Sequence, residues 1–182
     1  MKLDNLNYNK VTKIDTIKEL MDLAVKEAGD NIAFKYKEGK EVKDVTYKEF
    51  QNDTYYLGTA LSTIDMIDKH VAVIGENSYN WITVYLTVLK GNGVLVPIDK
   101  ELTCEEIINV LRSSDSSVLF FASKYKEYVE KIKEELPQIK YFIGFDEKED
   151  KENILSYSRF MEKGKKEYEN GNKIYENIED NI

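Results

Sequence analysis

The sequence predicts an α/β fold of three layers, in which a mostly parallel sheet carries helices on both faces and an N-terminal antiparallel β-hairpin lies at the sheet edge. Short apolar runs at residues 71–74, 94–96, 118–121 and 141–143 alternate with helical patterns, as strands with core on both faces require. A length of 182 residues suits one well-cored domain and leaves no room for a second full domain.

The N-terminal part predicts a helix followed by the hairpin. Residues 1–14 are polar and are interpreted as an N-terminal extension. Two extended runs, 32–37 and 42–46, flank a turn through Gly39, which is the pattern of a β-hairpin. Before them, residues 16–28 place their apolar side chains on one helical stripe, formed by Ile17, Leu20, Met21, Ala24, Val25 and Ala28.

Capping boxes mark the starts of two further helices. Thr46 with Glu49, and Thr103 with Glu106, have the spacing at which each side chain satisfies a free backbone N–H of the first turn. Between these helices, the segment 79–90 is apolar nearly all round. We therefore expect the 79–90 helix to be the most buried helix of the domain.

The C-terminal third predicts two more helices. Residues 124–136 place apolar side chains on one face until Pro137 ends the helix. Residues 169–182 are polar and weakly patterned and read as a linker or truncated end, so the α/β subdomain itself spans 15–168. Ser156 can start the last helix, whose inward side should carry Tyr157, Phe160, Met161 and Gly164.

The chain holds one histidine and one cysteine, which is too few to build a zinc site. His70 precedes the first central strand, at the end of the sheet opposite the usual ligand crevice, and is interpreted as a surface or structural residue. Cys104 lies in the first turn of a predicted helix, where the helix dipole could lower a thiol pKa. Because Cys104 lacks a histidine partner, we interpret it as a small capping or core residue.

The glycines do not form a nucleotide-binding loop. Gly91 and Gly93 follow a helix and precede a strand, the reverse of the order in a dinucleotide-binding motif, so they predict a helix C-cap and the start of a strand. Gly164 and Lys165 lack the upstream glycine and the following Ser or Thr of a Walker loop. Trp81 is interpreted as a core residue, with the wall of a substrate tunnel as the alternative.

The loops at the carboxyl ends of the strands form the default ligand rim of an open α/β sheet. Ser78 is most simply an N-cap, and Pro97 with Asp99 most simply redirects the chain, so we assign no catalytic, cofactor-binding or metal-binding residue in this sequence. The four rim loops are residues 75–78, 97–100, 122–123 and 145–146.

Composition excludes several classes of partner. A formal charge of -8, with lysines and glutamates interspersed, argues against a nucleic-acid partner. No run approaches the roughly 20 apolar residues of a transmembrane segment, and the N-terminus lacks the apolar core of a secretory signal. A single cysteine favours a reducing compartment, and we predict a cytoplasmic protein.

The motifs at the strand ends resemble those of a known family. A Gly75-Glu-Asn-Ser78 turn, the apolar helix 79–90 and a strand ending in Pro97-Ile-Asp99 follow one another, and a Thr46-Tyr-x-Glu-Phe50 helix start follows the hairpin. This order resembles the N-terminal subdomain of the adenylate-forming (AMP-binding) enzymes, especially the acyl-CoA synthetases such as long-chain fatty acid–CoA ligases. The resemblance covers residues 15–145.

The resemblance implies that this chain is an N-terminal fragment of an ATP-dependent acyl-CoA synthetase. Such a parent activates a carboxylic or fatty acid as an acyl-adenylate and then forms a CoA thioester, using ATP, Mg and coenzyme A. The family's phosphate-binding loop, acidic motifs and C-terminal lysine have no match in this sequence, so no catalytic residue is carried over and no cofactor is expected in the fragment. Its expected partners are the remainder of its own enzyme and the carboxylic acid substrate of the parent.

Two alternatives stay open from the sequence. The chain could be a free-standing, non-catalytic binding or scaffold module of the same fold, or a flavodoxin-like sensor domain, since alternating strands and helices suit both. A fragment should expose apolar surface where its neighbours would dock, and we therefore expect self-association or dye binding stronger than for an ordinary monomer.

Overall fold

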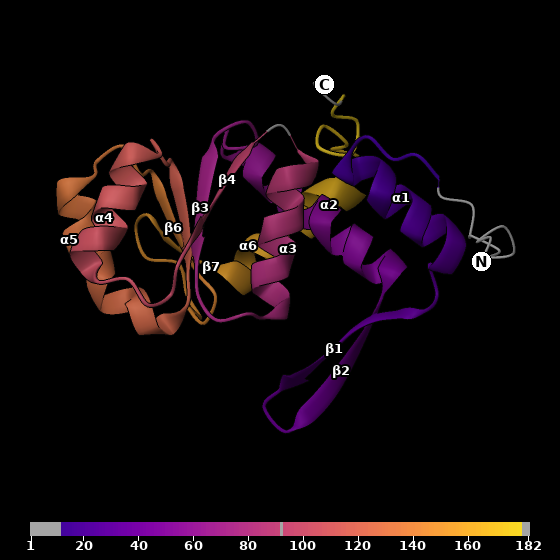
Figure 1. Cartoon of the computed structure of the whole chain (residues 1–182), viewed down its shortest axis with the longest axis horizontal. Coiled ribbons are helices and arrows are strands. Elements are labelled where there is room, and N and C mark those ends of the chain that lie inside the picture. The colour runs from indigo at the N-terminus through magenta and orange to yellow at the C-terminus, as the bar shows by residue number, and fades with distance from the viewer. Residues whose placement is uncertain (1–11, 92, 180–182) are drawn as a thin grey trace, which may run out of the picture.

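The computed structural model describes residues 12–91 and 93–179 and confirms the predicted α/β class (Figure 1). Five parallel strands form the central sheet in the order β4-β3-β5-β6-β7. Helices cover both faces of this sheet, so the three-layer arrangement is as predicted. The strands are β3 (His70–Ile74), β4 (Val94–Ile98), β5 (Val118–Phe121), β6 (Tyr141–Gly144) and β7 (Ile154–Ser156).

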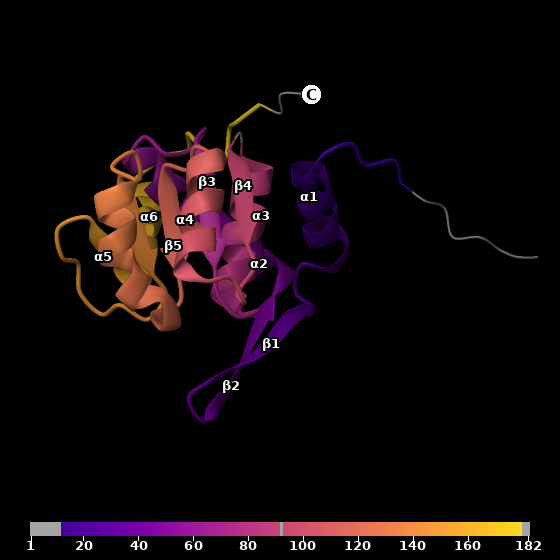
Figure 2. The ribbon, with the colours of Figure 1, turned by 60° about the vertical axis from the view of Figure 1, so that its left-hand side comes forward.

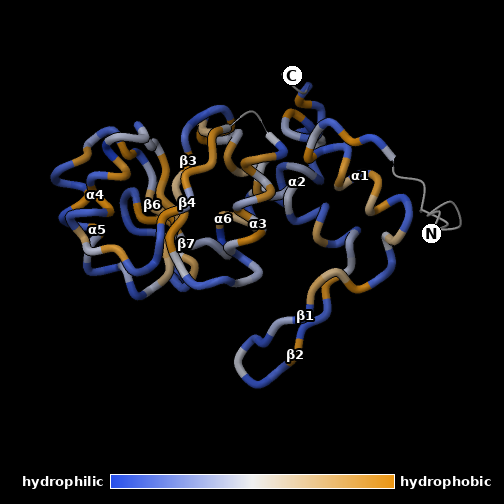
Figure 3. Tube along the Cα trace, viewed as in Figure 1, coloured by the Kyte–Doolittle hydropathy of each residue, from blue (hydrophilic) through white to orange (hydrophobic). Residues whose placement is uncertain are grey.

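Alternate residues of each central strand point to opposite faces and build two separate cores. On β5, Leu119 and Phe121 face α4 (Cys104–Ser113) and α5 (Lys126–Glu135). Val118 and Phe120 face the other layer, formed by α2 (Tyr47–Thr63), α3 (Tyr79–Lys90) and α6 (Tyr157–Glu169). Figure 3 shows this concentration of hydrophobic residues along the central strands.

The β-hairpin forms a sheet of its own, which corrects the prediction that it lies at the sheet edge. Strands β1 (Ile32–Glu38) and β2 (Glu41–Thr46) pair only with each other and project from the helical layer (Figures 1 and 2). Their aromatic side chains pack on helices: Phe34 lies 4.7 Å from Phe50, and Tyr36 stacks on Tyr79 at 4.9 Å between ring centroids. Packing on α2 and α3 therefore fixes the base of the hairpin.

Helix α2 begins with the predicted capping box, and helix α1 (Ile17–Ala28) begins with one that was not predicted, formed by Thr16 and Glu19. At the start of α2, the Thr46 hydroxyl accepts the Glu49 N–H at 3.2 Å, and the Glu49 carboxylate accepts the Thr46 N–H at 2.8 Å. The hydrogen bonds to Thr46 lower the pKa of Glu49. Each box satisfies backbone donors that a helix start otherwise leaves unpaired.

Helix α3, which was expected to be the most buried, is buried to about the same extent as α2: five of its twelve residues are buried, against eight of seventeen in α2. In α3, Trp81, Tyr85 and Leu89 lie four residues apart on one stripe and stay partly exposed. The longer α2 packs against α1, α3 and α6 and buries most of its second half. The apolar composition of α3 therefore exceeds what its neighbours in this chain cover.

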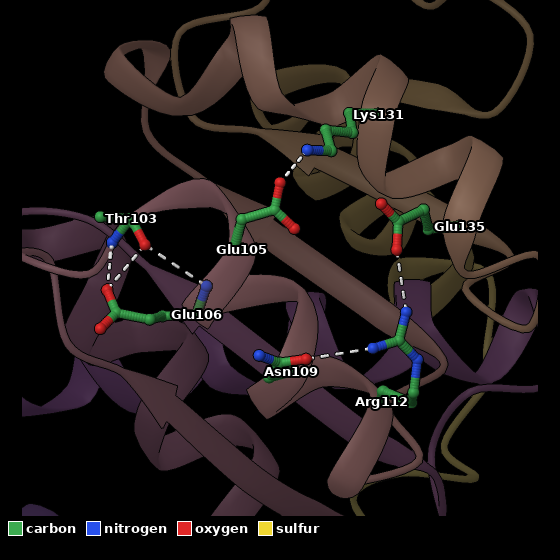
Figure 4. Close-up of polar contacts among 7 residues, drawn as sticks. All are labelled: Thr103, Glu105, Glu106, Asn109, Arg112, Lys131 and Glu135. Atoms are coloured by element: carbon green, nitrogen blue, oxygen red, sulfur yellow. Dashed lines mark hydrogen bonds and ion pairs between the residues drawn. The ribbon is translucent and has the colours of Figure 1, made fainter.

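Helices α4 and α5 lie side by side on one face of the sheet (Figure 4). Thr103 and Glu106 form the predicted capping box of α4. Ion pairs join the exposed sides of the two helices, between Glu105 and Lys131 and between Arg112 and Glu135, the latter at 2.9 Å. A short 3₁₀ turn, η1 (Ser123–Tyr125), precedes α5 in place of the first helical turn expected from residue 124.

The last part of the chain packs more closely than its sequence suggests. Strand β7 was not predicted; it adds to β6, where Phe142 pairs with Ile154. Ser156 caps α6, and Tyr157, Phe160 and Gly164 are buried as predicted. Beyond α6, where a linker or a truncated end was expected, Tyr175 is 3% exposed. Within the described ranges, no helix combines the length and apolar character needed to cross a bilayer.

Candidate functional site

The carboxyl ends of the parallel strands form the first candidate site, because ligands of open α/β sheets bind beyond these ends at a switch in strand order. Strand β3 lies between β4 and β5, so the chain turns from one side of β3 to the other after β4. The loops 75–78 and 122–123 flank this switch point, and the loops 97–100 and 145–146 lie at the ends of the neighbouring strands.

The two loops at the switch point contact each other closely. The Ala122 N–H donates to the Ile74 carbonyl oxygen at 3.1 Å. A Cβ atom added to Gly75 would lie 3.1 Å from the Ala122 Cβ and 3.7 Å from the Phe145 ring. Glycine at position 75 therefore suits the close approach of the two loops, and small groups occupy the switch point.

The polar side chains of the rim hold the rim loops together. The Ser78 hydroxyl accepts the Trp81 N–H at 3.2 Å as the N-cap of α3. Asp99 accepts the Glu101 N–H at 2.9 Å, as expected of a residue that turns the chain. Asp146 accepts the Ser123 N–H at 3.1 Å and so joins the ends of β5 and β6.

Neither His70 nor Cys104 is placed as a reactive group. The His70 ring donates from Nδ1 to the Ser114 carbonyl oxygen and joins β3 to the end of α4. Cys104 begins α4 and packs against the core, and burial raises the pKa of its thiol. Among residues 12–91 and 93–179, no group of three or more His, Cys, Asp or Glu side chains is arranged to hold a metal ion.

Gly91, Gly93 and Trp81, the other residues considered in the sequence, have structural roles and no reactive one. Gly91 is the C-cap of α3, and its N–H donates to the Thr87 carbonyl oxygen at 3.1 Å. A Cβ atom on Gly93 would lie 3.0 Å from the Lys69 carbonyl oxygen, so the start of β4 needs a small residue there. Trp81 is partly buried against the core and stacks on Tyr85 at 5.1 Å.

An apolar groove beside α1 is one feature that the sequence did not identify as a site. It encloses about 340 Å³, and its walls are almost entirely carbon. Leu20 and Tyr47, at its rim, are 47% and 37% exposed. The apolar stripe of α1 signalled part of this surface, but not that the stripe would stay uncovered. The lining residues are Leu20, Met21, Ala24, Val25, Phe34, Tyr47, Phe50 and Leu86.

Lys90 is a second feature that the sequence did not reveal. It lies at the end of α3 with 4% of its surface exposed. Its ammonium lies 3.5 Å from the centroid of the Tyr55 ring and 3.4 Å from the Thr54 hydroxyl. Burial lowers the pKa of Lys90 to about 8. No local pattern marks this environment, because its other wall comes from Tyr175.

Comparison with solved structures identifies the class of fold. The anthranilate CoA ligase AuaEII, solved with anthranoyl-AMP, matches 90% of this chain with a TM-score of 0.73 at 18% identity, and 30% of that enzyme is covered. The adenylation domain of a carboxylate reductase from Mycobacterium chelonae matches 82% of this chain with a TM-score of 0.69 at 16% identity, and 29% of it is covered. The fold is that of adenylate-forming ligases.

Sequence comparison identifies the family. The chain belongs to the AMP-binding enzyme family, which matches residues 21–176. The long-chain-fatty-acid–CoA ligase ACSBG2 of Xenopus laevis is 22% identical over 82% of this chain and 21% of its own length. The long-chain-fatty-acid–CoA ligase of Thermus thermophilus is 29% identical over 66% of this chain and 22% of its own length. The chain thus spans about a fifth of these relatives.

These findings confirm the resemblance to the acyl-CoA synthetases and other adenylate-forming ligases. The match is to the N-terminal region only. Membership of this family leaves the flavodoxin-like sensor without support, although the strand order is shared with that fold. None of the relatives named above is a free-standing binding module.

Proposed function

We propose that this chain is the N-terminal portion of an ATP-dependent acyl-CoA synthetase. The parent enzyme would activate a carboxylic or fatty acid as an acyl-adenylate and then transfer the acyl group to the thiol of coenzyme A. The observation that carries the proposal is the family match over residues 21–176 in a chain that spans about a fifth of fatty-acid–CoA ligases. The domain described above would then act as a scaffold in that enzyme.

ATP, Mg and coenzyme A would be bound by the whole enzyme. Adenylation requires donors and cations fixed around the α-phosphate. The rim side chains of this chain do not fit that task, since Ser78, Asp99 and Asp146 accept backbone N–H groups of their own loops. Lys100 is paired with Glu76 at 2.6 Å. We therefore derive no catalytic step from residues of this chain.

The main partner of this chain would be the remainder of the enzyme, which would dock at the apolar groove beside α1. Leu20 and Tyr47 at the groove, and Leu89 on α3, expose apolar surface around the same helices. Exposed apolar surface of this kind is expected where another part of a protein docks. Without that partner, two copies of the chain would associate through it. The single cysteine, which cannot form an intramolecular disulfide, suits an enzyme of the reducing cytoplasm.

The test measures exchange of labelled pyrophosphate into ATP with a panel of carboxylic acids. We expect no exchange from the 182-residue chain alone, and exchange from a polypeptide extended to the length of the relatives. Robust exchange by the chain alone would refute the scaffold role. The coding sequence beyond Ile182 offers a second test: a Ser/Thr/Gly-rich loop shortly afterwards supports the proposal, and an immediate stop codon contradicts it.

A further inference from the structure

The segment 172–178, which we call the strap, follows α6 and lies across three helices. Figure 1 shows this segment beside α1 and α2. The Lys18 ammonium of α1 donates to the Ile178 carbonyl oxygen at 2.7 Å. The Tyr175 hydroxyl donates to the Thr87 carbonyl oxygen of α3 at 2.6 Å. The strap therefore joins the N-terminal helix to the helical layer of the sheet.

The Tyr175 ring lies in a slot that two glycines make possible. A Cβ atom on Gly58, in the middle of α2, would overlap the ring, and one on Gly91 would lie 3.1 Å from it. A glycine inside a helix costs about 1 kcal/mol relative to alanine. The fit of the ring accounts for this unfavourable residue at position 58, and it indicates that the closed strap is a specific arrangement.

Closing the strap buries Lys90. The Lys90 ammonium lies between the Tyr55 ring, at 3.5 Å, and the Tyr175 ring of the strap, at 5.9 Å. Among residues 12–91 and 93–179, no carboxylate lies within 4.0 Å of it. The more distant charges that act on it are Asp22 and Lys18 of α1 and Glu176 of the strap.

We propose that the strap is a proton-linked latch, which closes more tightly over Lys90 when its ammonium group loses a proton. Closing the strap takes this cation out of water without giving it an ion pair, which is unfavourable. The Tyr55 ring offsets part of that penalty through a cation–π contact. A neutral amine pays no such penalty, so deprotonation of Lys90 favours the closed strap.

The direction of the pH dependence follows from the two states. Burial lowers the pKa of Lys90 to about 8 with the strap closed, and removing the Tyr175 wall on opening should return the pKa toward the ordinary lysine value of 10.5. The open state then binds more protons, and the closing constant rises about tenfold from pH 7 to pH 9. Above pH 10 the trend reverses, because burial raises the pKa of the Tyr55 and Tyr175 phenols.

Trypsin cleavage after Lys173 in the 182-residue chain tests the latch. The rate is divided at each pH by the rate for an unstructured peptide of the same sequence, so that it reports opening of the strap. We expect this ratio to fall about tenfold from pH 7 to pH 9, and to become independent of pH in Lys90→Met. The control Lys166→Met, on the exposed side of α6, should keep the fall. A flat ratio in the unchanged chain, or a fall that persists in Lys90→Met, would overturn the proposal.

A titration of the Lys90 side chain by NMR keeps the test decisive if Lys90→Met does not fold. A pKa near 8 supports the latch, and an ordinary lysine value contradicts it. Tyr175→Phe keeps the ring in its slot but loses the hydrogen bond to Thr87, so it should raise cleavage at every pH while keeping the tenfold slope. None of these readouts depends on adenylation activity, so the latch can fail while the proposed function stands.

Discussion

Replacing Gly164 by alanine should push α6 away from α2. Gly164 is buried on the side of α6 that faces α2. A Cβ atom at this position would overlap the Tyr56 carbonyl oxygen and would lie 2.8 Å from the Ala60 Cβ. The main-chain oxygen cannot move aside by a change of rotamer, so the two helices would have to separate.

The expected cost is the difference between two opposing effects. Alanine is intrinsically better than glycine in a helix by about 1 kcal/mol. Overpacking a close contact costs about 1–3 kcal/mol, and an obstruction by main chain favours the upper end. The free energy of unfolding should therefore fall by about 2 kcal/mol. For a chain of this length, the melting temperature should fall by roughly 4–8 °C.

Urea unfolding followed by Trp81 fluorescence and far-ultraviolet circular dichroism measures the effect. The control Lys163→Ala, on the exposed side of the same helix, should change the free energy of unfolding by less than about 0.5 kcal/mol. If Gly164→Ala were as stable as the unchanged chain, or more stable, the close approach of α2 and α6 would be wrong.

Three further experiments test other parts of the structure. Thr46→Ala removes the capping box of α2 and should lower the free energy of unfolding by about 1 kcal/mol in urea, whereas the neighbouring Lys48→Ala should change it little. Leu20→Ser should reduce the binding of a hydrophobic dye to the groove, while Lys26→Ser on the same helix should leave it unchanged; equal binding by both would exclude the groove as the dye site. Because burial raises the pKa of Cys104, its reaction with a maleimide at pH 8 should be slower than that of a cysteine peptide, and the difference should vanish in denaturant. A fast reaction in the folded chain would contradict that environment.

The features that the sequence predicted are those that local pattern determines. The capping boxes at Thr46 and Thr103 involve residues three positions apart, so the helix starts follow directly from the sequence. The strand at 118–121 has the bounds expected from its apolar run. Ser78 and Gly91 cap α3 as their types and positions indicate.

The features that the sequence did not predict depend on distant partners. The hairpin lies away from the sheet edge because Tyr36 packs on Tyr79. The alternation of residues within the hairpin does not reveal this contact. Strand β7 has three residues, too few to give a periodic signal, and it exists by pairing with β6. The environment of Lys90 and the apolar groove beside α1 both depend on which helix faces become covered in the folded chain.

The slot for the Tyr175 ring couples two positions that are far apart in the chain. Any side chain at position 58 would occupy the space that the ring now fills. A substitution of Gly58 in evolution is therefore tolerated only together with a smaller residue at position 175, or with loss of the strap. Homologous chains are expected to keep glycine and tyrosine as a pair or to replace both.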